Sequence, residues 1–310
     1  METKSDTLRD VIKETVRHHL TEENGLALGQ CLTAVGWVGG TLPHLYEDDG
    51  MVEISMADVA GGGFAVGMAL AGRRPMYVIR YQGFNWYNSP IIANYACKSK
   101  EIWHRPCPMF IRSVAMEGAI GPVAGSSHHA LYYRMPGIKI FSPMTPEEYR
   151  ITYKEFMAED DVYYVSEHRG AYTNDKELPD ILKQNPDVVL FPISITRFSA
   201  MEAANALEQL GYTVSVAHVF RIKPFQPSVE ALQNLKHARY GGCVIDDDYP
   251  DGIAKSLACD LNIATGARVH ALGLENRSAG FAKAVDNLPP DSKKIVAYVL
   301  DTIIVNGKER

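Results

Sequence analysis

The sequence predicts an α/β protein with two doubly wound, mainly parallel-sheet domains. Short apolar segments alternate with segments of helical periodicity, an order that is typical of helix-flanked parallel sheets. A polar stretch divides these segments into two sets. The 310 residues are too many for one ordinary core, and 46% hydrophobic with 22% charged residues suits a folded globular protein.

The first set of segments runs from the amino end to about residue 180. Apolar residues recur at helical spacing over residues 8–20, and Asp6 or Thr7 could cap the expected helix. Apolar runs predict strands over 26–28, 52–56, 76–80, 108–114, 138–141 and 162–165. Helices are expected over 62–71 and 146–157, and loops over 36–41, 81–100 (entering a helix) and 116–129.

The polar residues between Arg169 and Asp187 are the best candidate for a linker. Beyond them, strands are expected over 188–193, 213–220, 242–245 and 269–272, and helices over 200–210, 228–235 and 252–261. Gly211 follows the first of these helices and suits its carboxyl cap, where a left-handed residue is favoured. We therefore expect one domain over residues 1–180 and a second over 186–310.

Charge and cysteine content exclude several classes of protein. The net charge of −6 argues against a general nucleic-acid binder. No apolar run approaches the ~20 residues that span a bilayer, so no membrane association is expected. The opening METKSDTLRDVIKETVRHHL mixes acids and bases, unlike a signal or transit peptide. Five scattered cysteines without a C-x-x-C pair indicate reduced thiols, and hence a cytoplasmic protein.

The segment 54–72, ISMADVAGGGFAVGMALAG, is the most informative part of the chain. It reads as a strand end, a turn of small residues over 57–63 and a helix, and Asp58 is the only charged residue between Glu53 and Arg73. A lone acid at such a turn either caps the helix, which is the commoner use, or handles a proton. Both interpretations remain open on this segment alone.

Three groups of residues follow predicted strands of the first domain, at the edge where open α/β sheets bind ligands. They are Gln30 with the Gly-rich loop to Thr41, Asp58, and the segment 80–90, RYQGFNWYNSP. The aromatic residues of this segment suit either ordinary packing or stacking on a flat heterocycle. They are Tyr81, Phe84, Trp86 and Tyr87.

The loop that follows the fourth predicted strand adds His128 and His129. A histidine pair in a polar loop is more often solvated than catalytic, although histidine is the usual proton shuttle near neutral pH. The chain lacks the G-x-G-x-x-G and P-loop motifs, H-E-x-x-H, G-x-S-x-G and any metal-spaced acid cluster, so no metal site is expected on it. Aromatic residues that can stack on a ring, together with one acid, could bind the heterocycle of a cofactor. Without a phosphate-binding loop, they would form only half of its binding site.

Several segments together resemble a known family. ISMADVAGGGFAVGMALAGRRPMYVIRYQGFNWYNSPIIANYACK is similar to the beta subunit of the first component of 2-oxo acid dehydrogenases, such as pyruvate dehydrogenase. More broadly, the chain resembles the pyrimidine-binding and carboxyl-terminal halves of transketolase. The resemblance extends from about residue 6 to 300 through MPGIKIFSPMTPEEYR, DDVYYVSEHR, VVLFPIS, LEQLGYTVSVAHVFRIKPF and CVIDDDYPDGIAKSLA.

This resemblance implies a pyrimidine-binding domain followed by a transketolase carboxyl-terminal-type domain. It also implies thiamine diphosphate shared between two different chains: an alpha-type partner subunit would hold the diphosphate and its magnesium, and this chain the aminopyrimidine. Asp58 takes the place of a family glutamate that hydrogen-bonds the pyrimidine. Phe84, with Tyr81, falls where an aromatic residue stacks on that ring, and Gln30 falls where these subunits carry a second acid.

The chain departs from the family pattern at three positions. Aspartate is shorter than glutamate by one methylene, about 1.5 Å of reach, which the small residues around Asp58 would have to offset by a closer backbone. Gln30 cannot ionise, so it cannot relay a proton. The family histidine falls near Val123 or Ala124, and His128 and His129 are the candidates to replace it.

The resemblance favours a beta-type subunit that decarboxylates a small 2-oxo acid and passes on the activated aldehyde, in an alpha2beta2 assembly. A transketolase-like transferase that acts on a ketose or acyl donor without lipoyl transfer is the first alternative. A non-catalytic scaffold subunit is the second, because a fold does not guarantee function. An unrelated nucleotide-binding protein is disfavoured by the missing phosphate loops.

Overall fold

A computed structural model describes residues 5–117, 120 and 125–305 of the chain. Contacts between residues divide it into two units. The first comprises Met1–Met116 and Pro122–Glu177, and the second comprises Glu117–Gly121 and Leu178–Arg310. The domain limits of 1–180 and 186–310 stay a prediction about which parts fold independently. Within the described residues, no helix is both long and apolar enough to cross a bilayer.

Six strands of the first unit form parallel pairs in the order β2-β1-β3-β4-β6-β5. They are β1 (Leu26–Gln30), β2 (Met51–Ile54), β3 (Pro75–Ile79), β4 (Met109–Ala115), β5 (Ile138–Phe141) and β6 (Val162–His168). The central strands β3, β4 and β6 are buried along their whole length, as expected where helices cover both faces of a parallel sheet.

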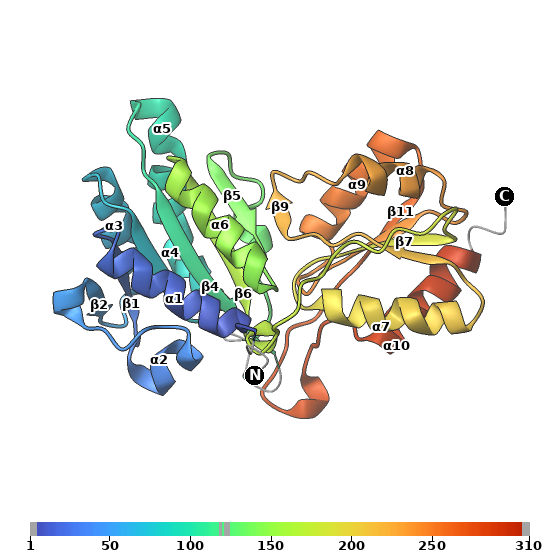
Figure 1. The fold of residues 1–310 in the computed structure, drawn as a ribbon, viewed down its shortest axis with the longest axis horizontal. Coiled ribbons are helices and arrows are strands. Elements are labelled where there is room, and N and C mark those ends of the chain that lie inside the picture. The colour runs from blue at the N-terminus through green and yellow to red at the C-terminus, as the bar shows by residue number, and fades with distance from the viewer. Residues whose placement is uncertain (1–4, 118–119, 121–124, 306–310) are drawn as a thin grey trace. The chain divides into compact units, whose positions relative to one another are not determined.

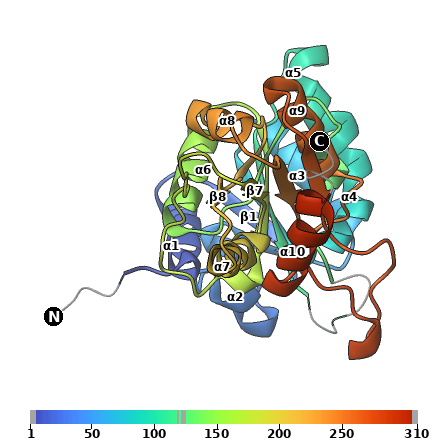
Figure 2. The same ribbon diagram turned by 90° about the vertical axis from the view of Figure 1, so that its right-hand side faces the viewer.

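Helices cover both faces of this sheet. In Figures 1 and 2, α1 (Leu8–Thr21) and α6 (Pro146–Ala158) lie on one face, and α3 (Asp58–Leu70) and α4 (Asn85–Ile91) lie on the other. The other helical segments are α2 (Ala34–Gly40), α5 (Cys97–Trp103), η1 (Glu47–Asp49), η2 (Gln82–Phe84), η3 (Ile92–Ala96), η4 (His129–Tyr132) and η5 (Arg169–Ala171).

The amino-terminal helix confirms the sequence prediction. Thr7 caps α1, and a reciprocal capping box joins its side chain to Asp10. The apolar face of the helix, which includes Leu8, Ile12 and Val16, is buried.

Two other segments differ from expectation. The segment 36–41 was expected as a loop, but α2 occupies it, and Gly36–Gly40 all have φ between 51° and 79°. This is a left-handed turn, which costs roughly 1–2 kcal/mol for each residue other than glycine, and here Trp37 and Val38 adopt it. The third helix starts at Asp58, not near Gly62, so Asp58 lies inside its first turn.

The second unit has a four-stranded parallel sheet in the order β11-β10-β7-β8, flanked by α8 and α9 on one face and by α7 and α10 on the other (Figure 1). Its elements are β7 (Val188–Pro192), α7 (Thr196–Gln209), β8 (Val214–Val216), β9 (Arg221–Lys223), α8 (Val229–Lys236), β10 (Gly242–Ile245), α9 (Ile253–Thr265), β11 (Val269–Leu272), η6 (Lys283–Val285), α10 (Ser292–Tyr298) and η7 (Val299–Ile304). Gly211 has φ +90° directly after the end of α7, in the predicted left-handed conformation. The doubly wound α/β class is confirmed in both units.

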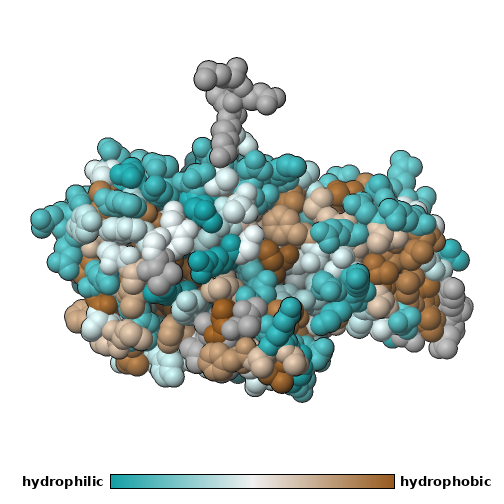
Figure 3. Space-filling view, turned by 90° about the horizontal axis from the view of Figure 1, so that it is seen from below, coloured by the Kyte–Doolittle hydropathy of each residue, from teal (hydrophilic) through white to brown (hydrophobic). Residues whose placement is uncertain are grey.

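Exposed apolar side chains gather on one part of the first unit. Of the large hydrophobic residues that the structure describes as exposed, nine lie in the segment from Met56 to Trp103, which includes α3, α4 and α5. Phe64 and Trp86 are 60% and 59% exposed. On the face of the molecule in Figure 3, hydrophobic groups lie among hydrophilic ones. A segment so rich in exposed apolar groups is typical of a surface that a partner covers.

Candidate functional site

Asp58 is held by two amide side chains and does not cap its helix. The N-cap position of α3 is Ala57, and no side-chain capping bond is present there. The Oδ1 atom of Asp58 accepts a hydrogen bond from Gln30 Nε2 at 2.8 Å and a longer one from Asn88 Nδ2 at 3.3 Å. The capping interpretation is therefore wrong, and the structure brings Gln30 and Asp58 together as the resemblance implied.

Tyr77 orients the second of these amides. Its hydroxyl donates to Asn88 Oδ1 at 2.7 Å, which leaves the Nδ2 group of Asn88 facing Asp58. Burial, and then the charge of Asp58, raise the pKa of Tyr77, so its hydroxyl keeps the proton that it donates. Asn88 and Tyr77 were not expected from the sequence.

Two glycines allow α3 to approach these residues closely. A Cβ on Gly61 would lie 2.6 Å from Ile54 Cδ1 and 2.7 Å from the Tyr77 hydroxyl, and one on Gly62 would lie 2.8 Å from Asn88 Oδ1. No side chain fits at such distances unless a neighbour moves. Gly61 and Gly62 therefore allow α3 to pack closely against Ile54, Tyr77 and Asn88.

Gln30 carries a free acceptor beside the acid. The residue is 5% exposed, and its Oε1 atom is buried with no hydrogen-bond partner among the described residues. A buried unpaired oxygen costs free energy unless a ligand or water satisfies it. Asp58 Oδ1 accepts the hydrogen bonds from both amide groups. The Asp58 Oδ2 atom and the Gln30 Oε1 atom are therefore the two acceptors that a ligand could use. Such a pair fits a heterocycle that carries an amino group.

Aromatic residues precede Asn88 in the chain and join the group around Asp58 through the backbone. Phe84 is half-buried, and its carbonyl accepts from Asn88 Nδ2 at 3.0 Å, so it belongs to the group around Asp58. The ring centroids of Tyr81 and Phe84 are 6.1 Å apart, and those of Phe84 and Tyr87 are 6.5 Å apart. The predicted stacking residues Tyr81 and Phe84 thus lie close to each other, and the backbone of Phe84 contacts Asn88, whereas Trp86 and Tyr87 are exposed.

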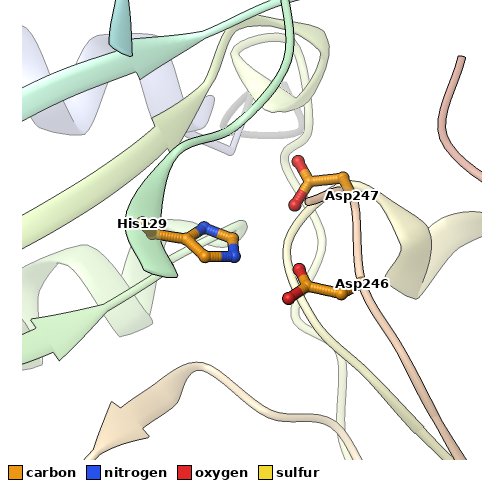
Figure 4. A group of neighbouring side chains, drawn as sticks. All are labelled: His129, Asp246 and Asp247. Atoms are coloured by element: carbon orange, nitrogen blue, oxygen red, sulfur yellow. The ribbon is translucent and has the colours of Figure 1, made fainter. Parts of the chain in front are cut away.

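The two histidines are not solvated. His129 is fully buried at the start of η4 (Figure 4), and its Nδ1 atom lies 3.1 Å from Ser166 Oγ. His128 is partly buried with its Nε2 atom unpaired among the described residues, and burial lowers its pKa to about 4. It is therefore a neutral imidazole at neutral pH. The family histidine position near Val123 or Ala124 lies outside the described residues.

A buried set of amides anchors the histidine segment. The Nε2 group of Gln82 donates to Ser166 Oγ at 2.7 Å and to the Ser113 carbonyl at 3.2 Å, and Gln82 Oε1 accepts from the His128 backbone N–H at 2.6 Å. Ser166 thus contacts both Gln82 and His129.

The same amide set continues along α4. Asn85 Nδ2 donates to the Gln82 carbonyl, to Ser113 Oγ and to the Tyr164 hydroxyl. Gln82, Asn85 and Asn88 are all fully buried, and they recur at a spacing of three residues. Three amides on one helical face were the signal in the sequence that could have identified this set.

The second unit has a buried acidic segment. Asp246 and Asp247 follow β10 (Figure 4) and are both buried. Ser194 Oγ donates to Asp247 Oδ2 at 2.8 Å. These aspartates belong to the segment CVIDDDYPDGIAKSLA, which contributed to the resemblance but received no role from the sequence.

The sequence also matches known proteins. The family "Transketolase, pyrimidine binding domain" matches residues 7–174. The chain is 24% identical to the 2-oxoisovalerate dehydrogenase subunit beta of Bacillus subtilis, over 70% of this chain and 72% of the relative. It is also 24% identical to the pyruvate dehydrogenase E1 component subunit beta of the same organism, over 83% of this chain and 84% of the relative.

Solved structures show the same fold. A split-gene transketolase described as an inactive beta4 tetramer superposes with a TM-score of 0.74 at 15% identity, over 97% of this chain and 99% of that one. The family match covers more than half of the chain, and it includes Gln30, Asp58 and Phe84. By sequence, fold and the residues gathered at the end of its strands, the chain belongs to the transketolase pyrimidine-binding domain family.

Proposed function

We propose that this chain is the beta-type subunit of a two-chain thiamine diphosphate-dependent enzyme that decarboxylates a 2-oxo acid. The observation that carries the proposal is the arrangement at Asp58, where two amides hold one carboxylate oxygen and leave two acceptors open. Relatives named as subunits of 2-oxoisovalerate and pyruvate dehydrogenases support this reaction class.

The residues present fit the aminopyrimidine half of the cofactor. Asp58 Oδ2 would hold a proton shared with a ring nitrogen, Gln30 Oε1 is an acceptor for an N–H group, and Phe84 with Tyr81 would supply an aromatic wall. When bound, thiamine diphosphate supplies a nucleophilic carbon and an electron sink for decarboxylation. Asp58 Oδ2 is the atom that would share a proton with a pyrimidine nitrogen, while Gln30 and Asn88 fix the orientation of the carboxylate.

The two histidines have distinct proposed roles. His128 is neutral near pH 7, since burial lowers its pKa to about 4, and its unpaired Nε2 atom can accept or donate one hydrogen bond to a substrate oxygen. His129 is proposed only to position this segment, because its Nδ1 atom lies 3.1 Å from the buried Ser166 Oγ.

The other half of the cofactor requires a partner chain. The sequence has no phosphate loop, so an alpha-type subunit would hold the diphosphate and its magnesium. The exposed apolar residues from Met56 to Trp103 lie on both sides of Asp58 in the sequence and would supply a surface for that subunit. An alpha2beta2 assembly in the cytoplasm is the form that we propose.

The experiment is reconstitution of this chain with an alpha-type partner. Asp58→Ala should abolish thiamine diphosphate-dependent decarboxylation while the circular dichroism spectrum stays unchanged. Asp48→Ala, which removes an exposed acid on η1, serves as the matched control and should keep full turnover. Full turnover in the Asp58→Ala enzyme would remove Asp58 from the mechanism.

A further inference from the structure

The first sheet ends in a strand that has an open side. Among the described residues, β1 is the only strand that pairs with β2, which lies at the end of the sheet (Figure 1). The Ala27 N–H donates to the Gly50 carbonyl at 2.9 Å. Alternate residues of a parallel strand direct their backbone groups to the same neighbour. The N–H and carbonyl of Glu53 therefore point away from β1, as expected at a sheet edge.

A cavity of about 430 Å³ lies beside this strand. Met51 and Glu53 of β2 line it, and Leu32 and Leu45 add apolar wall. The side chains at positions 51 and 53 point to the same face because side chains alternate along a strand. The volume falls within the range of ligand pockets, roughly 300–1,000 Å³. A chain laid along the edge could therefore place alternate side chains in this cavity.

The charge at this edge is negative. Residues 18–72 contain seven acidic residues and no lysine or arginine. Glu47 and Glu53 line the cavity, and neither forms an ion pair within the part of the chain that the structure describes. Glu53 Oε2 accepts from the N–H and the hydroxyl of Thr33 at 2.9 and 2.6 Å, so its Oε1 atom is left for a cation. The ring of Tyr46, which is 62% exposed, lines the same cavity and can face an ammonium group.

The charge decides which kind of strand fits this edge. Two copies of the chain paired along β2 would bring acidic side chains against one another, and like charges across a strand pair are destabilising. A strand with lysine or arginine at alternate positions avoids this repulsion. Its aliphatic stems would cover Leu45 and Met51, and its charged ends would reach Glu47 and Glu53.

We propose that the open edge of β2 binds an extended, basic segment of a partner protein as an added strand. The outward N–H and carbonyl of Glu53 supply main-chain hydrogen bonds to that segment, and the cavity selects basic side chains at alternate positions. This interaction does not depend on the reaction proposed above, because neither the cofactor nor its acid Asp58 takes part in it.

The first test titrates the full-length chain into a fluorescein-labelled peptide of alternating valine and lysine, with fluorescence anisotropy as the readout. The peptide should bind saturably, and the same peptide with glutamate in place of lysine should not bind. A fully N-methylated peptide of equal charge should bind about tenfold more weakly, because it has no backbone N–H donors. Equal affinity for the methylated peptide would show that charge alone attracts it and would overturn strand addition. The absence of binding by the lysine peptide would overturn the proposal as a whole.

The second test locates the bound peptide. Glu53→Gln should weaken its binding about threefold and the double variant Glu47→Gln, Glu53→Gln about tenfold, the size expected for cross-strand charge pairs. Glu230→Gln, which changes an exposed acid on α8 of the second unit, should leave the affinity unchanged. In the wild type, the peptide should slow hydrogen exchange of the Glu53 amide. Unchanged affinity in the double variant, or unchanged exchange at Glu53, would contradict the proposal. Protection of this amide by dimerisation without peptide would assign the edge to a second copy and also reject it.

Discussion

Two carboxylates of the first unit sit in contrasting surroundings. Glu167 is buried on β6, and each of its oxygens accepts two hydrogen bonds: Arg112 donates to both, and Tyr149 and Tyr172 donate to one each. Asp58 is only partly buried and uses one oxygen for two amides. A carboxylate whose lone pairs are all engaged can only stabilise the fold, whereas one with a free oxygen beside another free acceptor can take a ligand.

The two tyrosines that contact Glu167 remain hydrogen-bond donors to its carboxylate. Burial, and then the charge of Glu167, raise the pKa of both Tyr149 and Tyr172, so each hydroxyl remains a donor. Arg112 also donates to the buried Thr41 hydroxyl at 3.0 Å. The buried ion pair therefore ties the turn after α2 to β4 and β6.

The largest expected effect comes from breaking this ion pair. Arg112→Met leaves the Glu167 charge buried without its main partner, which should lower the free energy of unfolding by about 3–5 kcal/mol. Urea denaturation measures the loss. The double variant Arg112→Met, Glu167→Gln removes both charges and should recover most of it. A single variant as stable as the wild type would mean that water or other donors replace the arginine.

His128 should make stability depend on pH. Its pKa is about 4 in the folded chain against 6.5 in the unfolded one, so the unfolded state binds the proton more readily. The stabilisation is complete above pH 6.5 and is lost as the pH falls toward 4, by about 2 kcal/mol at pH 5. Thermal unfolding of the wild type and of His128→Gln across this range measures the effect. Parallel pH profiles for the two proteins would contradict the prediction.

Tyr77→Phe should separate orientation from stability at the Asp58 group. The variant loses the donor to Asn88 Oδ1 and leaves that oxygen buried, which should lower the free energy of unfolding by about 1 kcal/mol. Because Asn88 can then rotate away from Asp58, turnover of the reconstituted pair should fall further than stability alone explains. Turnover at the wild-type level would show that Gln30 alone orients the carboxylate.

The smallest effect concerns the aromatic wall. Phe84→Ala should weaken thiamine diphosphate binding by roughly 0.5–1.5 kcal/mol, the value of one stacked aromatic pair. Calorimetry of the reconstituted pair measures this affinity, and Tyr87→Ala, which removes an exposed ring on the following helix α4, is the control. Equal weakening in both variants would assign the change to packing of α4 and not to stacking.

The sequence predicted the alternation of strands and helices well because apolar runs and helical spacing are local signals. The left-handed turn at Trp37 and Val38 was missed, since its conformation depends on packing that no local pattern encodes. The roles of Asp58, Gln30 and Phe84 stay predictions, which came from their places after predicted strands and from the resemblance to a known family. Asn88 and Gln82 were not predicted, because an amide becomes informative only when burial and a partner are known.

The absence of a side chain at Gly61 affects three other residues of the site, namely Tyr77, Asn88 and Asp58. A methyl group there would press on the Tyr77 hydroxyl, and that hydroxyl holds Asn88, which in turn steadies Asp58. Gly61 thus limits how Asp58 is held, although it has no role of its own in the proposed cofactor contacts. A replacement of Asp58 by the longer glutamate would therefore require compensating changes at Gly61, Tyr77 or Asn88.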